Sequence, residues 1–355
     1  GGIQSLKVYE TFMPPVGGTA DRPTDVKPGM VYYNKDFKTI EFWDGNFWKQ
    51  VDNITQSGRA VLGGGRVDPS TKISEMQSYN IHTLGNATYF GNLTSAKQGV
   101  TGFGSRIRAI YGGGNTPSYL NHIDYGTFQS EGNTIDFGDM TGAFAYRAGS
   151  SSSTRGIFST GYTGSANSNV IDYIQISTIG DAVDFGDATV ANRSAKALAS
   201  PTRFVQAGGY TSEYHKGMEF LTISSLGNTV SFGDLSNRVF GAEGVSNNIK
   251  GVFAGGRDHV NLFINNIDSI TISSTGSVED FGDLINTTTH SVGSSTNTRG
   301  VFCGGYAGSS PYTFIEVMSF ITFNSAGNSI DFGDLIVGTD MAGGTSDSHG
   351  GLGGF

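Results

Sequence analysis

The chain has 355 residues, a formal net charge of −9 and 15% charged residues, and 54 of its residues are glycine. Glycine at about twice its usual ~7% share indicates collagen, disorder or a turn-rich β protein, and the lack of a G-X-Y period together with 12% aromatic residues excludes the first two. The acidic balance argues against nucleic acid or an anionic membrane as the main partner, and no apolar run approaches the ~20 residues of a membrane span.

The chain begins with Gly1-Gly2 rather than Met, and no secretory signal is visible, so we expect that an upstream piece was removed or left out. Its one cysteine, Cys303, excludes an intramolecular disulfide framework. Cys303 takes the place that Ala207 and Ala254 have in other repeats, which predicts a buried small residue. The sequence has no HExxH, EF-hand or CxxC spacing, and we expect neither a metal nor a cofactor.

An aromatic-rich segment, Arg22–Val51, comes first in the chain. Its pattern predicts a three-stranded meander with a tight turn at Asp44-Gly45. The strands are expected at Met30–Tyr33, Thr39–Trp43 and Phe47–Val51. Both tryptophans of the chain lie in this segment, and we expect residues 1–55 to form a separate module for attachment or oligomerisation. The candidate contact residues of this module are Tyr32, Phe42, Trp43 and Trp48.

The rest of the chain, residues 56–355, repeats one phrase. Phe-Gly-Asp, with Phe-Gly-Asn as its first copy, recurs at steps of 47, 48, 47, 49 and 51 residues. A period of this length predicts a repeat architecture, in which each unit buries its apolar face against the next. The phenylalanines of the phrase are Phe90, Phe137, Phe185, Phe232, Phe281 and Phe332.

One repeat unit, Thr202–Asn248, shows four short β segments. A hairpin turn with Gly227 joins the middle two, because glycine takes the positive φ that a tight connection needs. Four antiparallel strands in ~48 residues match one blade of a β-propeller. The segments are expected at Arg203–Ala207, Met218–Ser224, Thr229–Phe232 and around Val239–Val245.

Six such units are followed by a partial seventh at the C-terminus. We therefore predict an all-β fold, a six-bladed propeller in which the last strand pairs with the first blade and removes a free edge. A seven-bladed ring, with its seventh blade built from Met341–Phe355 and N-terminal residues, is the alternative.

The repeated Phe-Gly-Asp phrase is interpreted mainly as a packing device. Each phenylalanine is expected to fill the space between adjacent blades and to contribute about 1.5–3 kcal/mol. The glycine allows a bulge or the close approach of two strands, and the aspartate can accept hydrogen bonds from turn N–H groups. A ring of cation ligands is the other interpretation of the aspartates, which are Asp139, Asp187, Asp234, Asp283 and Asp334.

The repeats from Arg59 to Phe355 resemble kelch repeats, which combine a hydrophobic strand, Gly-Gly, a variable loop, a second strand, a turn, an aromatic residue and then arginine. Arg193 and Arg238 match the basic position, and Lys97 and Arg147 match it more loosely. Phenylalanine replaces the usual tryptophan in every unit, and the arginine is lost in the last two. The resemblance implies a kelch-like propeller but no kelch-type adaptor function.

The whole chain resembles tail-fibre-like and other virion structural proteins of bacteriophages, marine ones in particular. Two segments carry this resemblance, the Arg22–Val51 module and the GVFAGG…ITISSTG…DFGDL repeats. The resemblance implies a non-enzymatic structural protein that is located in the virion or outside cells. Its implied partners are other virion proteins and further copies of itself, with a trimer expected for a fibre.

The loops after each Gly-Gly are the variable part of the repeat. We expect binding there, because variable loops on a rigid scaffold usually carry function. These loops hold aromatic and polar groups suited to sugar faces or protein partners. The candidate contact residues are Tyr119, Tyr214, His215, Arg257, His259 and Tyr312.

Three classes of function remain open. The first is a virion structural protein, either a tail fibre or appendage or a capsid decoration, that presents its propeller for assembly or for contact with a host-surface glycan or protein. The second is a carbohydrate-binding lectin or adhesin, which overlaps the first. The third is a glycan-cleaving enzyme, which needs two convergent carboxylates that the sequence does not reveal. We predict no catalytic residues.

Overall fold

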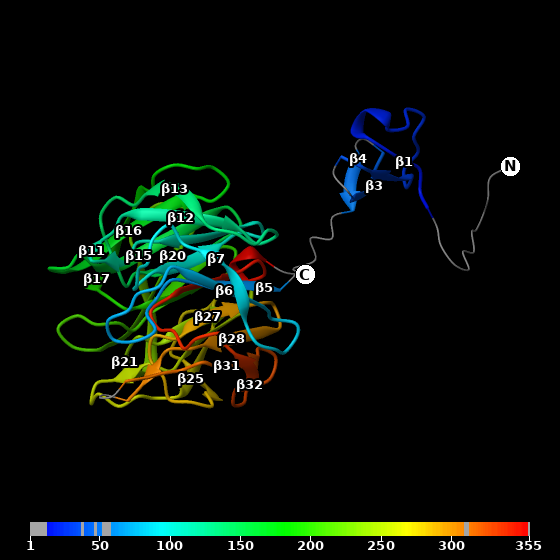
Figure 1. The fold of residues 1–355 in the computed structure, drawn as a ribbon. Coiled ribbons are helices and arrows are strands. Elements are labelled where there is room, and N and C mark those ends of the chain that lie inside the picture. The colour runs from blue at the N-terminus through cyan, green and yellow to red at the C-terminus, as the bar shows by residue number, and fades with distance from the viewer. Residues whose placement is uncertain (1–12, 37–38, 46–47, 52–57, 309–311, 354–355) are drawn as a thin grey trace. The chain divides into compact units, whose positions relative to one another are not determined.

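The computed structural model describes residues 13–36, 39–45, 48–51, 58–308 and 312–353. The chain divides into two compact units, Gly1–Thr55 and Gln56–Phe355, at the boundary expected from the sequence (Figure 1). Within the described ranges, the regular structure is β apart from two short 3-10 helices, η1 (Thr19–Asp21) and η2 (Gly350–Leu352). None of these helices is long and apolar enough to cross a membrane. Phe47 and the last two residues of the chain lie outside the described residues.

The N-terminal unit contains the expected meander and one strand more. Its sheet has the order β1-β2-β3-β4, in which the short β1 pairs parallel to β2 and the other pairs are antiparallel. Two residues are too few for β1 to show a periodic pattern, which is why the sequence did not predict it. The strands are β1 (Val16–Gly17), β2 (Val31–Asn34), β3 (Thr39–Trp43) and β4 (Trp48–Val51).

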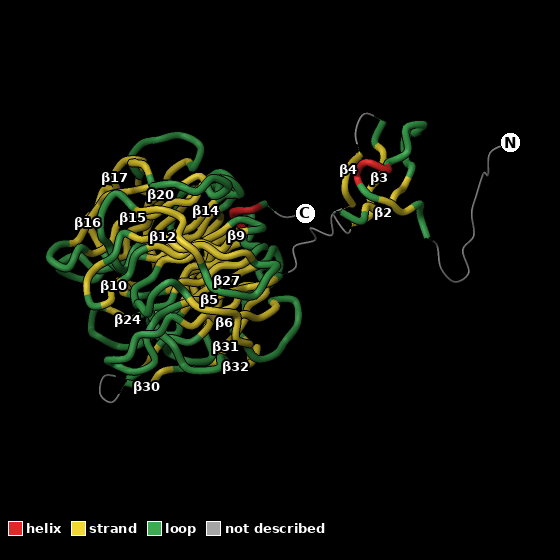
Figure 2. Tube along the Cα trace, turned by 45° about the horizontal axis from the view of Figure 1, so that its top comes forward, coloured by secondary structure: helices red, strands yellow, loops and turns green. Residues whose placement is uncertain are grey.

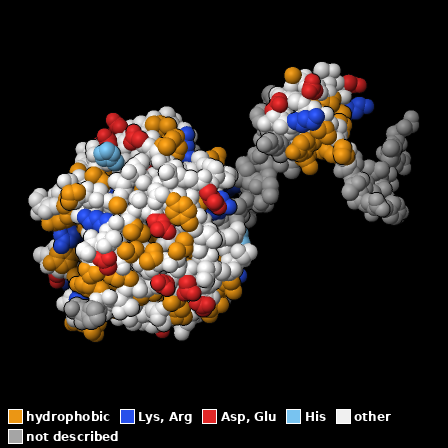
Figure 3. All heavy atoms as spheres, in the orientation of Figure 1, with side chains coloured by type: hydrophobic (Ala, Val, Ile, Leu, Met, Phe, Trp, Pro, Cys, Tyr) orange, Lys and Arg blue, Asp and Glu red, His pale blue; other side chains and the backbone are white. Residues whose placement is uncertain are grey.

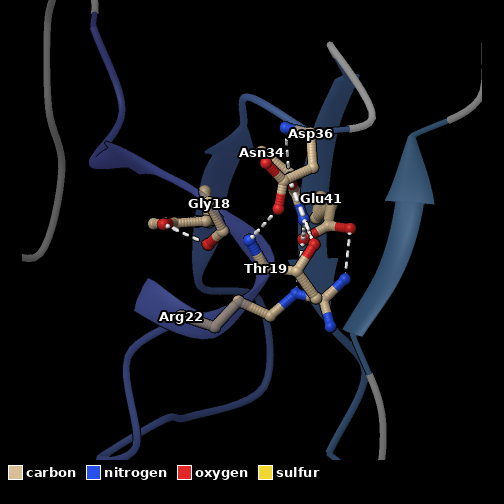
Figure 4. Close-up of polar contacts among 7 residues, drawn as sticks. Gly18, Thr19, Arg22, Asn34, Asp36 and Glu41 are labelled. Atoms are coloured by element: carbon tan, nitrogen blue, oxygen red, sulfur yellow. Dashed lines mark hydrogen bonds and ion pairs between the residues drawn. The ribbon is translucent and has the colours of Figure 1, made fainter.

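A buried carboxylate organises this small unit (Figure 4). Glu41 on β3 is fully buried, and Arg22 donates two hydrogen bonds to it, from Nε to Oε2 at 2.8 Å and from Nη2 to Oε1 at 2.6 Å. The Asn34 amide donates a third bond to Oε2 at 3.2 Å. The bonds from Arg22 lower the pKa of the Glu41 carboxyl, because they stabilise its charged form. The network therefore ties the segment that precedes β2 onto the sheet.

The larger unit consists of six antiparallel sheets of four strands each, with one further short strand on the fourth sheet. Strands fill the middle of this unit and loops cover much of its outside (Figure 2). From the inner strand outward, the first three sheets are β33 (Gly343–Ser346), β5 (Arg59–Gly63), β6 (Glu75–Asn80) and β7 (Thr88–Asn92); β8 (Thr101–Gly104), β9 (Arg108–Gly112), β12 (His122–Thr127) and β13 (Ile135–Asp139); and β14 (Ala148–Ser151), β15 (Arg155–Tyr162), β16 (Asn167–Gln175) and β17 (Val183–Asn192).

The second half repeats the same plan. The fourth to sixth sheets are β18 (Lys196–Ala199), β19 (Arg203–Ala207), β20 (His215–Thr222) and β21 (Val230–Phe240), with β24 (Arg257–Asp258) added at the outside; β22 (Glu243–Ser246), β23 (Lys250–Ala254), β25 (Asn266–Thr271) and β26 (Glu279–Asp283); and β27 (Val292–Ser295), β28 (Arg299–Cys303), β31 (Val317–Thr322) and β32 (Ile330–Asp334). Two small hairpins lie in the loops, β10 (Asn115–Thr116) with β11 (Ser118–Tyr119), and β29 (Tyr306–Ala307) with β30 (Thr313–Phe314).

The phase of the repeat differs from the prediction. The segment expected around Val239–Val245 is not one strand, because β21 runs on to Phe240 and β22 begins the next sheet as its inner strand. The break falls at Gly241, whose φ of 68° lies in the left-handed region and ends the extended backbone. Each sheet therefore takes its inner strand from the crossover that follows the preceding sheet. The first sheet takes β33 from the C-terminal partial repeat, as predicted, and the described residues of the larger unit form no seventh sheet of four strands.

Six residues at the beginning of the inner strands form a cycle of main-chain hydrogen bonds, which we call the axial ring. Each N–H donates to the carbonyl of the equivalent residue in the preceding sheet, and the N–H of Gly99 donates to Met341 at 2.8 Å, so the bonds return to their start. All six residues have φ between 53° and 69°. The sheets thus follow one another in a propeller-like arrangement. The axial ring consists of Gly99, Tyr146, Ser194, Gly241, His290 and Met341.

The abundance of glycine and serine has a physical cause at this axis. A cavity of about 50 Å³ is lined by residues of all six inner strands, and there the strands approach so closely that a Cβ on Gly102 would lie 2.6 Å from the N atom of Gly344. Serine hydroxyls then bind the carbonyls of the neighbouring inner strand. The bonds run from Ser151 to Gly104, from Ser246 to Ala199, from Ser295 to Ser246 and from Ser346 to Ser295.

The Phe-Gly-Asp phrase forms the contact between adjacent sheets, which we call the seam. All six phenylalanines are at most 3% exposed, and Phe185 of the third sheet packs in one cluster with Leu221 and Ile223 of the fourth. Its carbonyl accepts a hydrogen bond of 2.9 Å from the N–H of Gly227 in the next hairpin turn. The same bond joins Gly132 to Phe90, Gly180 to Phe137, Gly276 to Phe232, Gly327 to Phe281 and, between the last and first sheets, Gly85 to Phe332.

The glycine and aspartate of the phrase complete the seam. Gly186 has φ +147°, and a Cβ there would lie 2.6 Å from the carbonyl of Gly227, so only glycine fits. The aspartate acts differently from the prediction. The main-chain N–H of Asp187 donates to the Asn228 side chain at 2.9 Å, because the extended outer strand turns its N–H and not its carboxylate toward the next turn. The carboxylates of Asp139, Asp187, Asp234, Asp283 and Asp334 lie at residues that are half-buried or exposed.

Candidate recognition face

Two kinds of connection meet at one end of the sheets, the loops after Gly-Gly and the crossovers between sheets. We call this end the loop face. The residue directly after each Gly-Gly, or after Thr160-Gly161 in the third sheet, pairs through its main chain with the residue just before the axial ring. These six post-glycine positions are three tyrosines, two arginines and one asparagine. The pairs are Arg66 with Asp340, Asn115 with Gln98, Tyr162 with Ala145, Tyr210 with Arg193, Arg257 with Phe240, and Tyr306 with Thr289.

The Gly-Gly pair brings each loop onto the crossover. Gly208 and Gly209 have φ of 67° and 101°, which glycine adopts without the clash of a Cβ. A Cβ on Gly209 would also lie 2.9 Å from the carbonyl of Arg193. The two glycines therefore place Tyr210 next to Arg193, and the same geometry sets the other post-glycine positions.

Aromatic and guanidinium groups of the third, fourth and fifth sheets form one continuous group on this face. The guanidinium of Arg193 lies 4.3 Å from the ring centre of Tyr162 and 4.8 Å from that of Tyr210. Tyr210 contacts Tyr214 edge to face, with 5.7 Å between ring centres. The Tyr214 hydroxyl donates to Asn261 Oδ1 at 2.8 Å, which connects the fourth sheet to the loop of the fifth.

The group continues to the sixth and first sheets through Tyr306. Phe263, whose ring centre lies 5.3 Å from the Arg257 guanidinium, contacts Tyr306 at 5.6 Å. Tyr312 packs on Tyr306 with 5.2 Å between ring centres, and the Arg66 guanidinium lies 5.7 Å from the ring centre of Tyr306. We use the name aromatic arc for the following members of this group: Tyr119, Tyr162, Arg193, Tyr210, Tyr214, Arg257, Asn261, Phe263, Tyr306, Tyr312 and Arg66.

The loop residues predicted as contacts are placed in different ways. Tyr119, Tyr214, Arg257 and Tyr312 all belong to the aromatic arc. His259 is exposed in the loop after β24. His215 begins β20, and its Nδ1 is buried with no hydrogen-bond partner among the described residues.

Several members of the arc were not predicted as contacts. Tyr162, Tyr210 and Tyr306 were given no role from the sequence, and Arg193 was interpreted only as a kelch-like basic residue. All three tyrosines are post-glycine positions, so comparing that one position across the repeats would have found them. Asn261 carries no such signal, because its role depends on a left-handed φ of 66° and on a partner in another sheet.

Two buried carboxylates near this face are paired with basic groups inside the scaffold. Lys97 lies 2.8 Å from Asp124, and both side chains are at most 1% exposed. Arg147 lies 2.5 Å from Asp172 and also donates to the carbonyls of Val170 and Phe158. Pairing of this kind satisfies charges that burial would otherwise penalise. These ion pairs stabilise the crossovers that carry Lys97 and Arg147.

The axial ring closes the centre of the loop face. Burial lowers the pKa of His290 to about 3, so its imidazole stays neutral. The imidazole stacks on Tyr306 with an interplanar angle of 8°. Gly241 leaves the space that the imidazole fills, since a Cβ there would lie 2.8 Å from its Nδ1. At the other end of the axis, His349 binds the carbonyl of Gly104 at 2.9 Å, and burial lowers its pKa to about 4. One histidine thus lies near each end of the axis.

The remaining predicted residues are Cys303 and the four candidates in the N-terminal unit. Cys303 is buried, as predicted, and burial raises the pKa of its thiol to about 12. Tyr32 was predicted as an attachment residue, but it is 2% exposed and donates to the Gly18 carbonyl, so its side chain belongs to the core of its unit. Phe42 is 37% exposed, and the half-buried Trp43 and Trp48 contact each other at 5.7 Å.

No protein-family model matches this chain, and no curated protein matches it either. Within the described part of the chain, no group of three or more His, Cys, Asp or Glu side chains is placed to hold a metal ion. The geometry of the loop face is therefore the main observation that bears on function.

Proposed function

We propose that this chain is a non-enzymatic structural protein of a phage-like virion, an appendage or capsid decoration, whose larger unit presents the loop face to a host surface. The aromatic arc carries this proposal. It joins residues of at least four sheets into one group, and the seams and the axial ring hold its members in place. Rigid aromatic and guanidinium groups on a fixed scaffold are typical of contact surfaces, because little side-chain entropy is lost on binding.

The division into two units supports the same proposal. The N-terminal unit has its own sheet and its own buried network around Glu41, so it can serve as an attachment module independently of the larger unit. Phe42 and Trp43 supply partly exposed aromatic surface on β3 for that purpose. The virion assignment itself rests on the resemblance of this module and of the repeats to phage structural proteins.

Purified particles provide the test. Mass spectrometry of gradient-purified virions should show the chain at several copies per particle, and antibodies against the larger unit should label the particle surface in electron microscopy. A chain found only in the cytoplasm of infected cells, at background level in particles, would remove the virion proposal.

A lectin or adhesin is the second candidate, and the arc favours it because tyrosine faces and guanidinium groups are suited to sugars. A glycan-cleaving enzyme receives less support, because the buried Asp124, Asp172 and Asp340 are each held by a basic partner. Two further buried carboxylates, Glu219 and Asp268, have no basic partner among the described residues but accept hydrogen bonds from the hydroxyls of Thr229 and Ser236. Incubation with host polysaccharide should accordingly produce no new reducing ends. Release of oligosaccharides that Tyr214→Ala abolishes would instead favour the enzyme.

A further inference from the structure

We infer that part of the aromatic arc is a binding site for a polysaccharide that bears carboxylate groups. This inference rests on the proposed function, since it names the chemistry of the surface that the loop face would contact. The site spans the third to fifth sheets, where two guanidinium groups alternate with tyrosine rings. Its residues are Tyr162, Arg193, Tyr210, Tyr214, Arg257 and Asn261.

The charges of this part of the loop face point to an anionic ligand. Most basic groups near the face have an acidic partner, such as Arg66 with Asp340 at 2.9 Å and Arg238 with Glu213 at 2.6 Å. Among the described residues, no carboxylate lies within ion-pair distance of Arg193 or Arg257. A chain with a net charge of −9 thus keeps two uncompensated guanidiniums on one face. Guanidinium binds carboxylate through two parallel hydrogen bonds, which suits these residues to acidic groups.

The two guanidiniums are held in place by tyrosine and asparagine residues, which can also contact a sugar. Arg193 lies between two tyrosine rings, and its Nη1 is 3.5 Å from Asn167 Oδ1. Arg257 donates from Nε to the Asn261 carbonyl at 3.3 Å, and Asn261 accepts from Tyr214. A polysaccharide with repeated carboxylates can therefore contact Arg193 and Arg257 through different sugar units while its sugar rings lie on tyrosine.

The neighbouring groups favour a saccharide over other anions. The loop of the fourth sheet presents hydroxyl and phenol groups, Thr211 and Tyr214, at half-buried positions. Nucleic acid needs a basic stripe that neutralises many phosphates, and the acidic chain does not provide one. Lys and Arg side chains are few on the side of the larger unit that Figure 3 shows, where hydrophobic side chains and uncoloured atoms make up most of the surface. Sugars with one carboxylate per residue match this low density of positive charge.

The test uses the full chain and polygalacturonate as the probe, in isothermal titration calorimetry or by retention on the immobilised polymer. Polygalacturonate should bind, and its methyl-esterified form, which keeps the rings but lacks the charge, should bind at least tenfold more weakly. Equal binding of both polymers would overturn the role of the guanidiniums. Binding of a phosphate-bearing mannan with none to polygalacturonate would overturn the carboxylate assignment.

Matched variants locate the site. Arg193→Met and Arg257→Met, which keep the apolar stem, should each weaken binding at least tenfold, and Tyr214→Ala should do the same through the lost ring. Arg238→Met lies on the same face but removes a guanidinium that is already paired, so it should change affinity less than twofold. If all four variants bind like the unmodified chain, the arc is not the site. Thermal melting of each variant separates loss of binding from loss of folding.

The outcomes also separate this inference from the proposed function. A chain that is abundant in particles but binds neither polygalacturonate nor other acidic polymers keeps the virion role and refutes the glycan site. A chain that binds polygalacturonate through Arg193 but is absent from particles supports the site and refutes the virion role.

Discussion

The seams and the post-glycine positions are both repeated six times, yet they differ in how far their copies resemble one another. At the seams, every copy has the same phenylalanine, the same glycine and the same bond from a hairpin glycine in the next sheet. At the post-glycine positions the backbone pairing recurs, but the side chain changes among tyrosine, arginine and asparagine. The repeat therefore separates its two tasks. The phenylalanine and glycine of the seam set the distance between sheets, the first by its side chain and the second by lacking one, and they stay uniform. The post-glycine positions are held by main-chain bonds, so their side chains are free to vary.

The largest expected effect comes from breaking a seam. Gly186→Val places a β-branched side chain at φ +147°, where even a Cβ would lie 2.6 Å from the Gly227 carbonyl. Backbone strain of about 1–3 kcal/mol and overpacking of about 1–3 kcal/mol together predict a loss of about 4 kcal/mol. Calorimetric melting measures it. Gly126→Ala is the matched control, because its Cβ would meet only Thr134 Cγ2 at 3.6 Å. Similar losses in both variants would show that the seam has no special role.

The buried ion pair at a crossover should give the next largest effect. Arg147→Met leaves the Asp172 carboxylate, which is fully buried, without its cation and should cost about 3 kcal/mol. Changing both residues, as in Arg147→Met with Asp172→Leu, should recover part of the loss because no uncompensated charge remains. Chemical denaturation of the single and double variants measures the coupling. Arg238→Met, which breaks an exposed pair, should cost less than about 1 kcal/mol.

Acid should weaken the axis through two histidines, the buried His290 and the half-buried His349. The pKa of His290 is about 3 and that of His349 about 4, both lowered chiefly by burial, whereas an unfolded histidine has a pKa near 6.5. Between these values the unfolded chain binds more protons than the folded chain. Stability is therefore fully present above pH 6.5 and is lost as the pH falls toward 4, by up to about 1.4 kcal/mol per pH unit for each histidine.

Melting temperatures between pH 7 and pH 4.5 measure this dependence. His290→Asn should make the curve shallower, because asparagine does not titrate and tolerates the left-handed φ of 54° at this position. An unchanged slope in this variant would mean that His290 is not the group that senses the acid.

The sequence predicted the features that depend on local pattern. The period, the hairpin glycines such as Gly227, the burial of Phe185 and the pairing of the C-terminal strand with the first sheet follow from spacing and from the need to cover apolar faces. The phase of the repeat was missed, because the residues alone do not say which sheet a crossover strand joins. Only the left-handed φ at Gly241 and its equivalents shows where one sheet ends.

The candidate site was predicted only in part, for a related reason. Tyr214 and Arg257 stand out within their own loops, but the arc exists because Tyr162, Arg193 and Tyr210 come from neighbouring sheets. Contacts between repeats depend on how neighbouring sheets pack. The spacing of the motifs indicates that the sheets follow one another, but it does not say which side chains meet. The Arg147–Asp172 pair was invisible for the same reason, since 25 residues separate two groups that meet in space.

The smallest expected effect lies on the loop face and sharpens the comparison with the seams. Tyr312 is 42% exposed at the end of the arc and contacts Tyr306 through one ring edge. Tyr312→Ala should therefore change the free energy of unfolding by no more than about 0.5 kcal/mol, because exposed side chains away from caps and cores contribute little. The same melting experiments that follow Gly186→Val measure this value. A loss as large as that of the seam variant would mean that the face is part of the scaffold, and the separation of the two tasks within one repeat would no longer hold.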